Sequence, residues 1–334
     1  MNEHYNVKEA RTTLERYAME SAKDNKLHLN RVLKTGVLTE VVLEDGDTGF
    51  VWRLIKRDEG TGEAEEIVFV MNGVICSTDL PPVHRIPKST NDKPIIMAQK
   101  VTITGLNATF FAEAMETIKE INLTVQREFK EGTLELWAPG NFQGVDSLEC
   151  MNRYFRRLRA DERDTGIPFP KEVDPKGILT DMTRPDLAHT EENEVQYFRS
   201  NVGEDGKRRF NNAKPQMFRN GDIVQISFTV AFVRGKRRMF RLKPILRAIA
   251  LLDGEYTWVR AFTRSHIQKI TKRQAANRAQ AAQGATKAWD VYQGPRAFKR
   301  KISYVTEDEM EVEEGMAQKR RAGGAEEEAD SGDM

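Results

Sequence analysis

The sequence predicts an α+β protein, with a mainly antiparallel β sheet or barrel-like body, a few packed helices and a disordered acidic C-terminal tail. Short β-branched and aromatic runs, separated by turn dipeptides such as Asn72-Gly73, fill residues 27–106. A clearer pair of strands follows at 223–252. The acidic residues crowd together after residue 302 with few apolar ones between them, which is typical of disorder.

Length and composition set the outer limits. The chain has 334 residues, of which 39% are hydrophobic and 31% are charged. That apolar share is below the usual value of about 45–50%, so we expect a globular body with disordered ends. No run approaches about 18 apolar residues, and the charged N-terminus lacks the apolar stretch of a secretory signal. Cys76 and Cys150 give neither a disulfide framework nor a zinc site, and fit a reducing, intracellular compartment.

The elements of the first half follow from local patterns. Residues 1–25 read as a charged helix or frayed arm whose apolar stripe is too thin for a core position. Strands are expected within 27–33, 37–45, 49–57, 65–76 and 94–105. Residues 107–120 predict a helix, because Asn107 or Thr109 can cap it and an apolar stripe follows at Phe110, Phe111, Ala114, Met115 and Ile118.

In the second half of the chain, some secondary-structure elements are weakly indicated by the sequence and others strongly. We expect a strand at 121–129, a helix at 147–162, a loop rich in Pro and Gly at 166–185, and a short helix at 191–199 with Thr190 as its cap. Residues 222–233 then alternate between a fully apolar face and a mixed face, as a half-buried hairpin strand does. Pro244 makes the return strand an edge or interrupts it.

These patterns give four segments. They are a charged N-terminal arm (1–25), an α+β body (26–262, with a candidate sub-boundary near 165–190), a basic helix (263–290), and a linker with a disordered acidic tail (291–334). The basic helix is predicted from its Ala, Gln, Lys and Arg content.

Charge is distributed very unevenly. The net charge of +1 hides a block at 206–301 with 23 basic and 4 acidic residues, net +19. Residues 302–334 carry a net charge of −8, and residues 1–205 carry −10. Such asymmetry is typical of a polyanion-binding segment beside acidic neighbours.

The sequence lacks the common catalytic motifs. It contains no phosphate-binding glycine loop, no G-x-S-x-G elbow and no H-E-x-x-H helix. The surroundings of His189, in DLAHTEENE, leave a metal or acid/base cluster as an alternative to a polar loop. We therefore lean towards a protein that is not an enzyme, and predict no catalytic residue, no cofactor and no metal.

The segment 207–247 combines cations with aromatic rings. Binding of single-stranded nucleic acid needs cations that replace the counterions of phosphates, and aromatic faces on which bases stack. The candidate nucleic-acid-binding residues are Lys207, Arg208, Arg209, Phe210, Arg234, Lys236, Arg237, Arg238, Phe240, Arg241, Lys243 and Arg247. Phe210 and Phe240 are the stacking candidates, and the turn at residues 234–238 is the sharpest feature, with four cations around one glycine.

The leading hypothesis is thus non-enzymatic binding of nucleic acid, single-stranded rather than duplex, with little sequence preference. The alternative is a structural or interaction protein whose basic hairpin binds an acidic protein partner, or pairs with the acidic part of its own chain. No membrane partner is expected, because the basic segment is not one amphipathic helix. Short basic clusters at 298–301 and 319–321 favour the nucleus over the cytoplasm.

Two resemblances extend this interpretation. Blocks between residues 95 and 255, among them TFFAEAMETIKEINLTVQREFKEGTLELW, MNRYFRRLRADE, VDPKGILTDM, HTEENEVQYFRS and LRAIALLD, resemble a large uncharacterised protein family of mushroom-forming fungi. That resemblance implies a eukaryotic, intracellular setting and no particular activity. The hairpin that begins Gly221-Asp222-Ile223-Val224 looks like part of an oligonucleotide-binding barrel, which is a likeness of fold only.

Overall fold

The computed structural model describes residues 5–21, 24, 26–35, 42–45, 51–57, 60, 62–86, 93–158, 166–203, 208–235, 239–256, 299–302 and 304. In chain order its helices and strands are α1 (Val7–Ser21), α2 (Val32–Thr35), β1 (Val42–Asp45), β2 (Val51–Arg57), β3 (Ala64–Glu66), β4 (Phe69–Asp79), β5 (Ala98–Thr104), α3 (Thr109–Thr124), β6 (Gly140–Phe142), β7 (Val145–Arg153), β8 (Arg156–Arg157), α4 (Ile178–Asp181), β9 (Leu187–Ala188), β10 (Gln196–Val202), β11 (Arg208–Asn212), β12 (Ile223–Arg234) and β13 (Phe240–Asp253).

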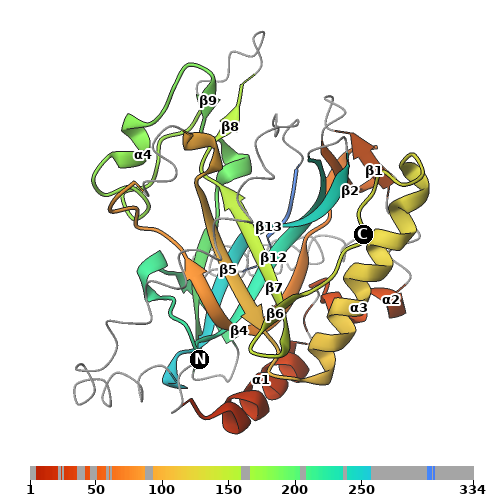
Figure 1. Cartoon of the computed structure of the whole chain (residues 1–334). Coiled ribbons are helices and arrows are strands. Elements are labelled where there is room, and N and C mark those ends of the chain that lie inside the picture. Colours follow the sequence, from red (N-terminus) through yellow and green to blue (C-terminus); the bar gives the residue numbers. More distant parts are fainter. Residues whose placement is uncertain are drawn as a thin grey trace, which may run out of the picture.

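Five of these strands close into a barrel at the centre of the molecule (Figure 1). The pairing runs β4–β5–β7–β13–β12, and β12 pairs back onto β4. All of these pairs are antiparallel except β7–β13, which are parallel and joined by one bridge, Ile245 with Met151. Numbered along the chain, the order is 1-2-3-5-4-1, which matches the strand order of the oligonucleotide-binding barrel.

The remaining strands extend this barrel along its two longest members. β2 pairs with the second half of β12 (Ala231–Val233), beyond the half that pairs with β4. β2 in turn pairs with β1 and β3. β10 pairs with the second half of β13 (Ala248–Leu251), beyond Ile245, which pairs with β7. β10 in turn pairs with β11. A lobe containing α4, β8 and β9 stands beside one end of the barrel (Figure 1). The expected α+β class with a mainly antiparallel, barrel-like sheet is therefore confirmed.

The barrel interior is the main hydrophobic core. Alternate residues of β12 point inwards, and Val224, Ile226 and Phe228 are fully buried there together with Leu246 and Ile249 of β13. The other face of β12 is polar, as predicted, but it is covered too, because Gln225, Ser227 and Thr229 are at most 1% exposed. The prediction of a half-buried strand is wrong on this point: the outer face of β12 lies beneath other segments.

Helices cover two sides of the barrel. The predicted helix at 107–120 is confirmed as α3, whose apolar stripe packs into the barrel core through Phe111, Met115 and Ile118. The N-terminal segment forms α1, which is the helical alternative predicted for it, but the expectation that its apolar stripe is too thin for a core position is wrong. Leu14 and Tyr17 of α1 are buried in a second cluster outside the barrel.

Four local predictions assign the wrong kind of secondary structure. Residues 147–162 were expected to be helical, because Leu148, Met151 and Phe155 recur at helical spacing, but the same stretch also fits a period of two and forms β7. Residues 27–33 form helical turns instead of a strand, and 121–129 continue α3 into a further turn. At 191–199, Thr190 caps only a single turn at Glu191–Asn193 before β10 begins.

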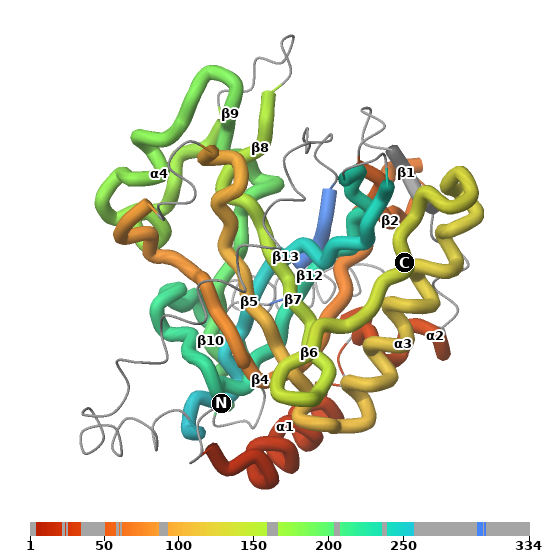
Figure 2. The backbone as a smooth tube through the Cα atoms, in the orientation of Figure 1, coloured from red at the N-terminus to blue at the C-terminus, as the bar shows by residue number. Residues whose placement is uncertain are grey.

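A short C-terminal strap, residues 299–302 and 304, lies against the outer face of β12 and β13 (Figure 2, blue). The backbone of Lys299 forms an isolated β-bridge with that of Glu65 in β3. Tyr304 is buried beside β10 and β11. The sequence assigned these residues to a linker, because their flanking residues are charged and low in apolar content. The predicted basic helix at 263–290 and the acidic tail from 305 onwards lie outside the described residues.

Candidate functional site

The predicted binding residues that lie in the described part of the chain do not converge on one surface. Arg208, Arg209 and Phe210 lie on β11, which is next to the end of β13 that carries Leu251. Phe240 begins β13 at the opposite end. The stretch of β13 from Phe240 to Leu251 spans about 36 Å at about 3.3 Å per residue. The two groups therefore belong to different ends of the molecule.

The β11 group faces the protein itself. Phe210 is 9% exposed, and its ring centroid lies 4.8 Å from that of Tyr304. Arg208 forms an ion pair with Glu20 of α1 at 3.0 Å and donates a hydrogen bond to Ser200. Arg209 is half-buried. In this structure Phe210 presents no free face to an incoming base, because Tyr304 already covers it.

The hairpin group is more open. Arg241 is 43% exposed and is paired with Glu135 at 2.6 Å. Phe240 packs against Phe129, with ring centroids 4.8 Å apart, so only part of its ring is accessible. Burial lowers the pKa of Lys243, which the charge of Arg241 lowers further and the charges of Glu149 and Glu135 raise. Arg234 ends β12 half-buried, while Lys207, Lys236, Arg237 and Arg238 lie outside the described residues.

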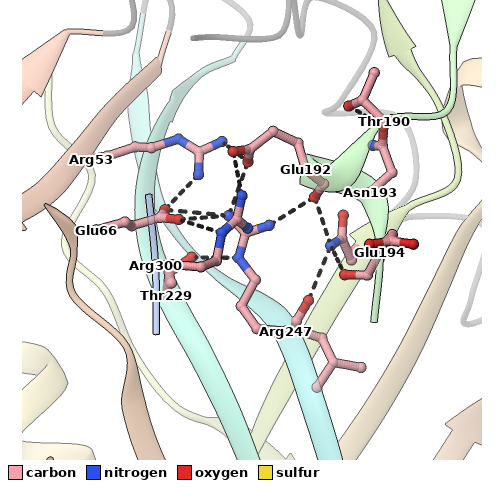
Figure 3. A network of polar contacts seen from close by, with 11 residues as sticks. Arg53, Glu66, Thr190, Glu192, Asn193, Glu194, Thr229, Arg247 and Arg300 are labelled. Carbon is pink, nitrogen blue, oxygen red and sulfur yellow. Dashed lines mark hydrogen bonds and ion pairs between the residues drawn. The ribbon is translucent and has the colours of Figure 1, made fainter. Parts of the chain in front are cut away.

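Arg247 is not a surface cation, so the prediction that it contacts phosphate does not fit its position. It is 1% exposed and belongs to a buried ion cluster made of Arg53, Glu66, Glu192, Arg247 and Arg300 (Figure 3). Its Nη2 lies 3.0 Å from Glu66 Oε2 and 3.2 Å from Glu192 Oε2. Its Nε donates to Thr229 Oγ1 at 3.1 Å, and its Nη1 donates to the carbonyl oxygen of Glu192 at 2.7 Å.

The ion cluster joins five segments that are distant in the sequence. Burial by itself would raise the pKa of Glu66, but the charges of Arg247, Arg53 and Arg300 outweigh it and hold that pKa well below its usual range. Glu66 is therefore ionised at neutral pH, and the cluster gathers three arginines around two glutamates. Because each charge is desolvated, the buried pairs tie β2, β3, the turn at Glu191–Asn193 and β13 together, and Arg300 adds the strap as the fifth segment.

The outer face of the barrel strands carries a smaller set of polar side chains. On β5, Lys100 and Thr102 alternate with the buried Val101 and Ile103. Their partners across the sheet are Met151 and Glu149 of β7. We call Lys100, Thr102, Glu149, Met151 and Lys243 the barrel face. The sequence analysis missed Lys100, although the alternation of Lys100 and Thr102 with the β-branched Val101 and Ile103 marks it as outward-facing.

Lys26 occupies an unusual position beside the strap. Its Nζ lies 3.9 Å from the ring centroid of Tyr304 and 4.6 Å from that of Phe210, and it donates to Gln225 Oε1 at 2.9 Å. Burial lowers its pKa to about 8; the charge of Asp24 raises that pKa, and that of Arg208 lowers it.

This position predicts a pH dependence of stability. Because the folded pKa of Lys26 is about 8 and the ordinary value is 10.5, the unfolded chain binds more protons between these pH values. The free energy of unfolding should therefore rise from pH 8 to pH 10.5 relative to a Lys26→Met variant. Urea unfolding of both proteins across this range measures the difference. A gap between wild type and variant that stays constant with pH would contradict the assignment.

A groove of about 1420 Å³ opens beside the strap. Its walls come from β3, from the start of β10 and from the strap, and Arg247 and Arg300 reach its lining. The groove carries lysines as well as glutamates, and Lys299 pairs with Glu63 at 2.7 Å. Because its lining carries both positive and negative charges, the groove is not selective for a polyanion.

The residues around His189 pack it into the protein interior. The side chain is 6% exposed and stacks on Phe169 with ring centroids 4.1 Å apart. Its Nδ1 lies 2.8 Å from the carbonyl oxygen of Tyr154, and burial lowers its pKa. Within the described ranges, no three His, Cys, Asp or Glu side chains gather as a metal site requires. No helix in those ranges combines the length and apolar character needed to cross a membrane.

Comparison with known proteins adds little to this description. No family model matches the chain, and no curated protein matches it. Among solved structures it is similar to gp2.5, a single-stranded DNA-binding protein encoded by bacteriophage T7, with 11% sequence identity, coverage of 56% of this chain and 91% of that chain, and a TM-score of 0.32. A likeness of this size supports no inference about fold or function, and the barrel described above rests on its own strand pairing.

Proposed function

We propose that this chain binds single-stranded nucleic acid with little sequence preference, through the barrel face and the turn between β12 and β13. The observation that supports the proposal most is where the basic turn falls in the barrel. In oligonucleotide-binding barrels the ligand lies across the second and third strands, between the loop joining strands 1 and 2 and the loop joining strands 4 and 5. Here those strands are β5 and β7, and the loop between strands 4 and 5 is the turn at 234–240.

The step from barrel to ligand is an analogy of fold, so the chemistry of the residues has to support it. Arg234 ends β12, and the connection from it to Phe240 of β13 contains Lys236, Arg237 and Arg238. Lys100 and Lys243 lie on the strands that lead away from it. Cations spaced along an extended surface suit a phosphate backbone, and contacts to phosphates carry no sequence information.

The proposal is tested by fluorescence anisotropy of labelled single-stranded oligonucleotides titrated with the full chain at several salt concentrations. We expect binding whose logarithm falls linearly with the logarithm of salt concentration, and weaker binding to a duplex of the same sequence. An acidic protein serves as competitor. If the chain binds that protein well and binds no oligonucleotide even at low salt, the basic turn serves a protein partner and the proposal is wrong.

The acidic tail offers these cations an alternative anion within the same chain. Residues 302–334 carry a net charge of −8, directly after the strap. Deleting 307–334, which retains Tyr304, should tighten oligonucleotide binding by roughly tenfold at about 50 mM salt, and the gain should vanish at high salt because the competition is screened. Anisotropy titrations of both chains measure this. Equal affinity at low salt would rule out the tail as a competitor.

A further inference from the structure

The ring of Tyr304 lies among two aromatic rings and a cation. Its centroid lies 4.7 Å from the ring of Phe198, tilted by 39°, and 4.8 Å from the ring of Phe210, which it meets edge-to-face at 62°. Lys26 Nζ lies over its face at 3.9 Å. Phe198 and Phe210 come from the neighbouring strands β10 and β11, so the slot between them belongs to the body and not to the strap. Two aromatic walls and a cation are the elements of a stacking site.

The polar edge of the ring is also met by fixed groups. The Tyr304 hydroxyl lies 3.2 Å from Ser227 Oγ, at the floor of the slot on β12. Gln225, two residues away on the same outer face, accepts a hydrogen bond from Lys26. A hydroxyl, which can donate or accept, therefore lies where the edge of a planar heterocycle would come to rest.

The strap that fills this slot is attached by Lys299, by Arg300 and by the packing of Ile302 and Tyr304 against the body. One bridge joins Lys299 to Glu65, and the pair of Lys299 with Glu63 is well exposed on both sides. Arg300 is the third cation of the ion cluster, beside two carboxylates. When Arg300 leaves, Arg53 and Arg247 remain with Glu66 and Glu192, so the cluster is neutral. Departure of the strap therefore leaves no buried carboxylate without a partner.

We propose that the slot formed by Phe198, Phe210, Lys26 and Ser227 is a nucleobase site, and that Tyr304 is a resident occupant which a base of a bound single strand replaces. Every base has a π face and fits such walls without regard to sequence. Lys26 and Arg208 at the slot would lie near the phosphate of that nucleotide. The involvement of a nucleic-acid strand rests on the function proposed above, whereas the slot can be tested without it.

The first test uses a nucleoside that carries no phosphate, so the barrel face plays no part in it. The probe is 2-aminopurine riboside, whose fluorescence is quenched on stacking. A Tyr304→Ala chain should bind it at least tenfold more tightly than wild type, and Tyr304→Phe should behave like wild type. Adding Phe210→Ala to Tyr304→Ala should weaken binding about fivefold to a hundredfold, the range that loss of one stacking wall implies. Thermal unfolding checks that each variant is folded. Equal binding by wild type and Tyr304→Ala, or no effect of Phe210→Ala, would overturn the proposal.

The second test uses the unmodified chain, so it does not depend on the folding of a variant. Amide hydrogen exchange of the strap is measured with a saturating single-stranded oligonucleotide and with an oligonucleotide of abasic sites that has the same phosphates. Exchange in residues 299–304 should rise severalfold with the first and not with the second. Binding of both without any change in the strap would overturn the slot while leaving the proposed function intact. Failure of both to bind would overturn the proposed function, and the nucleoside test would still decide the slot.

Discussion

Replacing Arg237 and Arg238 together by alanine is expected to weaken binding of a single-stranded oligonucleotide by roughly tenfold to a hundredfold at about 50 mM salt. Each lost phosphate contact on a single strand lowers the slope of log affinity against log salt by about 0.7, so the double variant should lose about 1.4 from that slope. The effect should shrink as salt increases. Anisotropy titrations at four or more salt concentrations give both quantities.

The matched control removes two cations from elsewhere on the protein. Lys8 of α1 and Lys34 of α2 are exposed and distant in sequence from the barrel strands. A Lys8→Ala/Lys34→Ala chain has the same net charge as the arginine variant. If both double variants lose the same affinity and the same slope, binding reflects overall charge, and the turn between β12 and β13 has no special part in it.

The second large effect concerns stability. Glu66→Gln should destabilise the fold by about 3–5 kcal/mol, because it leaves Arg53, Arg247 and Arg300 buried around the single carboxylate of Glu192. For a protein of this size that corresponds to a decrease of roughly 6–20 °C in Tm. Thermal and urea unfolding at neutral pH measure the change.

Glu65→Gln is the natural control, since it makes the same chemical change one position earlier on β3, where the side chain is half-buried. It should alter stability by less than about 1 kcal/mol. The difference between the two variants should also shrink as the pH falls below about 4.5, because wild-type Glu66 then loses the advantage of its lowered pKa. Similar stabilities for Glu66→Gln and Glu65→Gln at neutral pH would show that the cluster contributes little.

The sequence predicted those elements whose signals are local. Residues 223–234 form β12 because their alternation leaves no helical alternative, and Phe111, Met115 and Ile118 mark α3 by their spacing. The strand β7 was missed because Leu148, Met151 and Phe155 recur at helical spacing, whereas the strand buries Leu148 and Cys150, and only the neighbouring strand β5 decides between the two periods. Local periodicity cannot show which faces other segments will cover, and for this reason α1 and the outer face of β12 were misjudged.

The ion cluster and the strap could not be predicted from the sequence for a different reason. Glu66 stands in a run of acidic residues and Arg247 in a run of basic ones, so each looked like a solvated charge. Their partnership depends on the closure of the barrel, which brings β3 to β13. Tyr304 likewise lies between charged stretches, and its burial depends on β10 and β11. The basic turn was identified because its four cations lie within five consecutive residues, 234–238.

The central claim is that a single strand lies along the barrel face beside the basic turn. Lysine acetylation, followed by mass spectrometry with and without a saturating single-stranded oligonucleotide, tests it most directly. The account predicts that Lys100, Lys236 and Lys243 lose reactivity severalfold in the complex, while the exposed Lys8, Lys34 and Lys176 keep theirs. Unchanged reactivity of the first three lysines in a chain that demonstrably holds the oligonucleotide would contradict it.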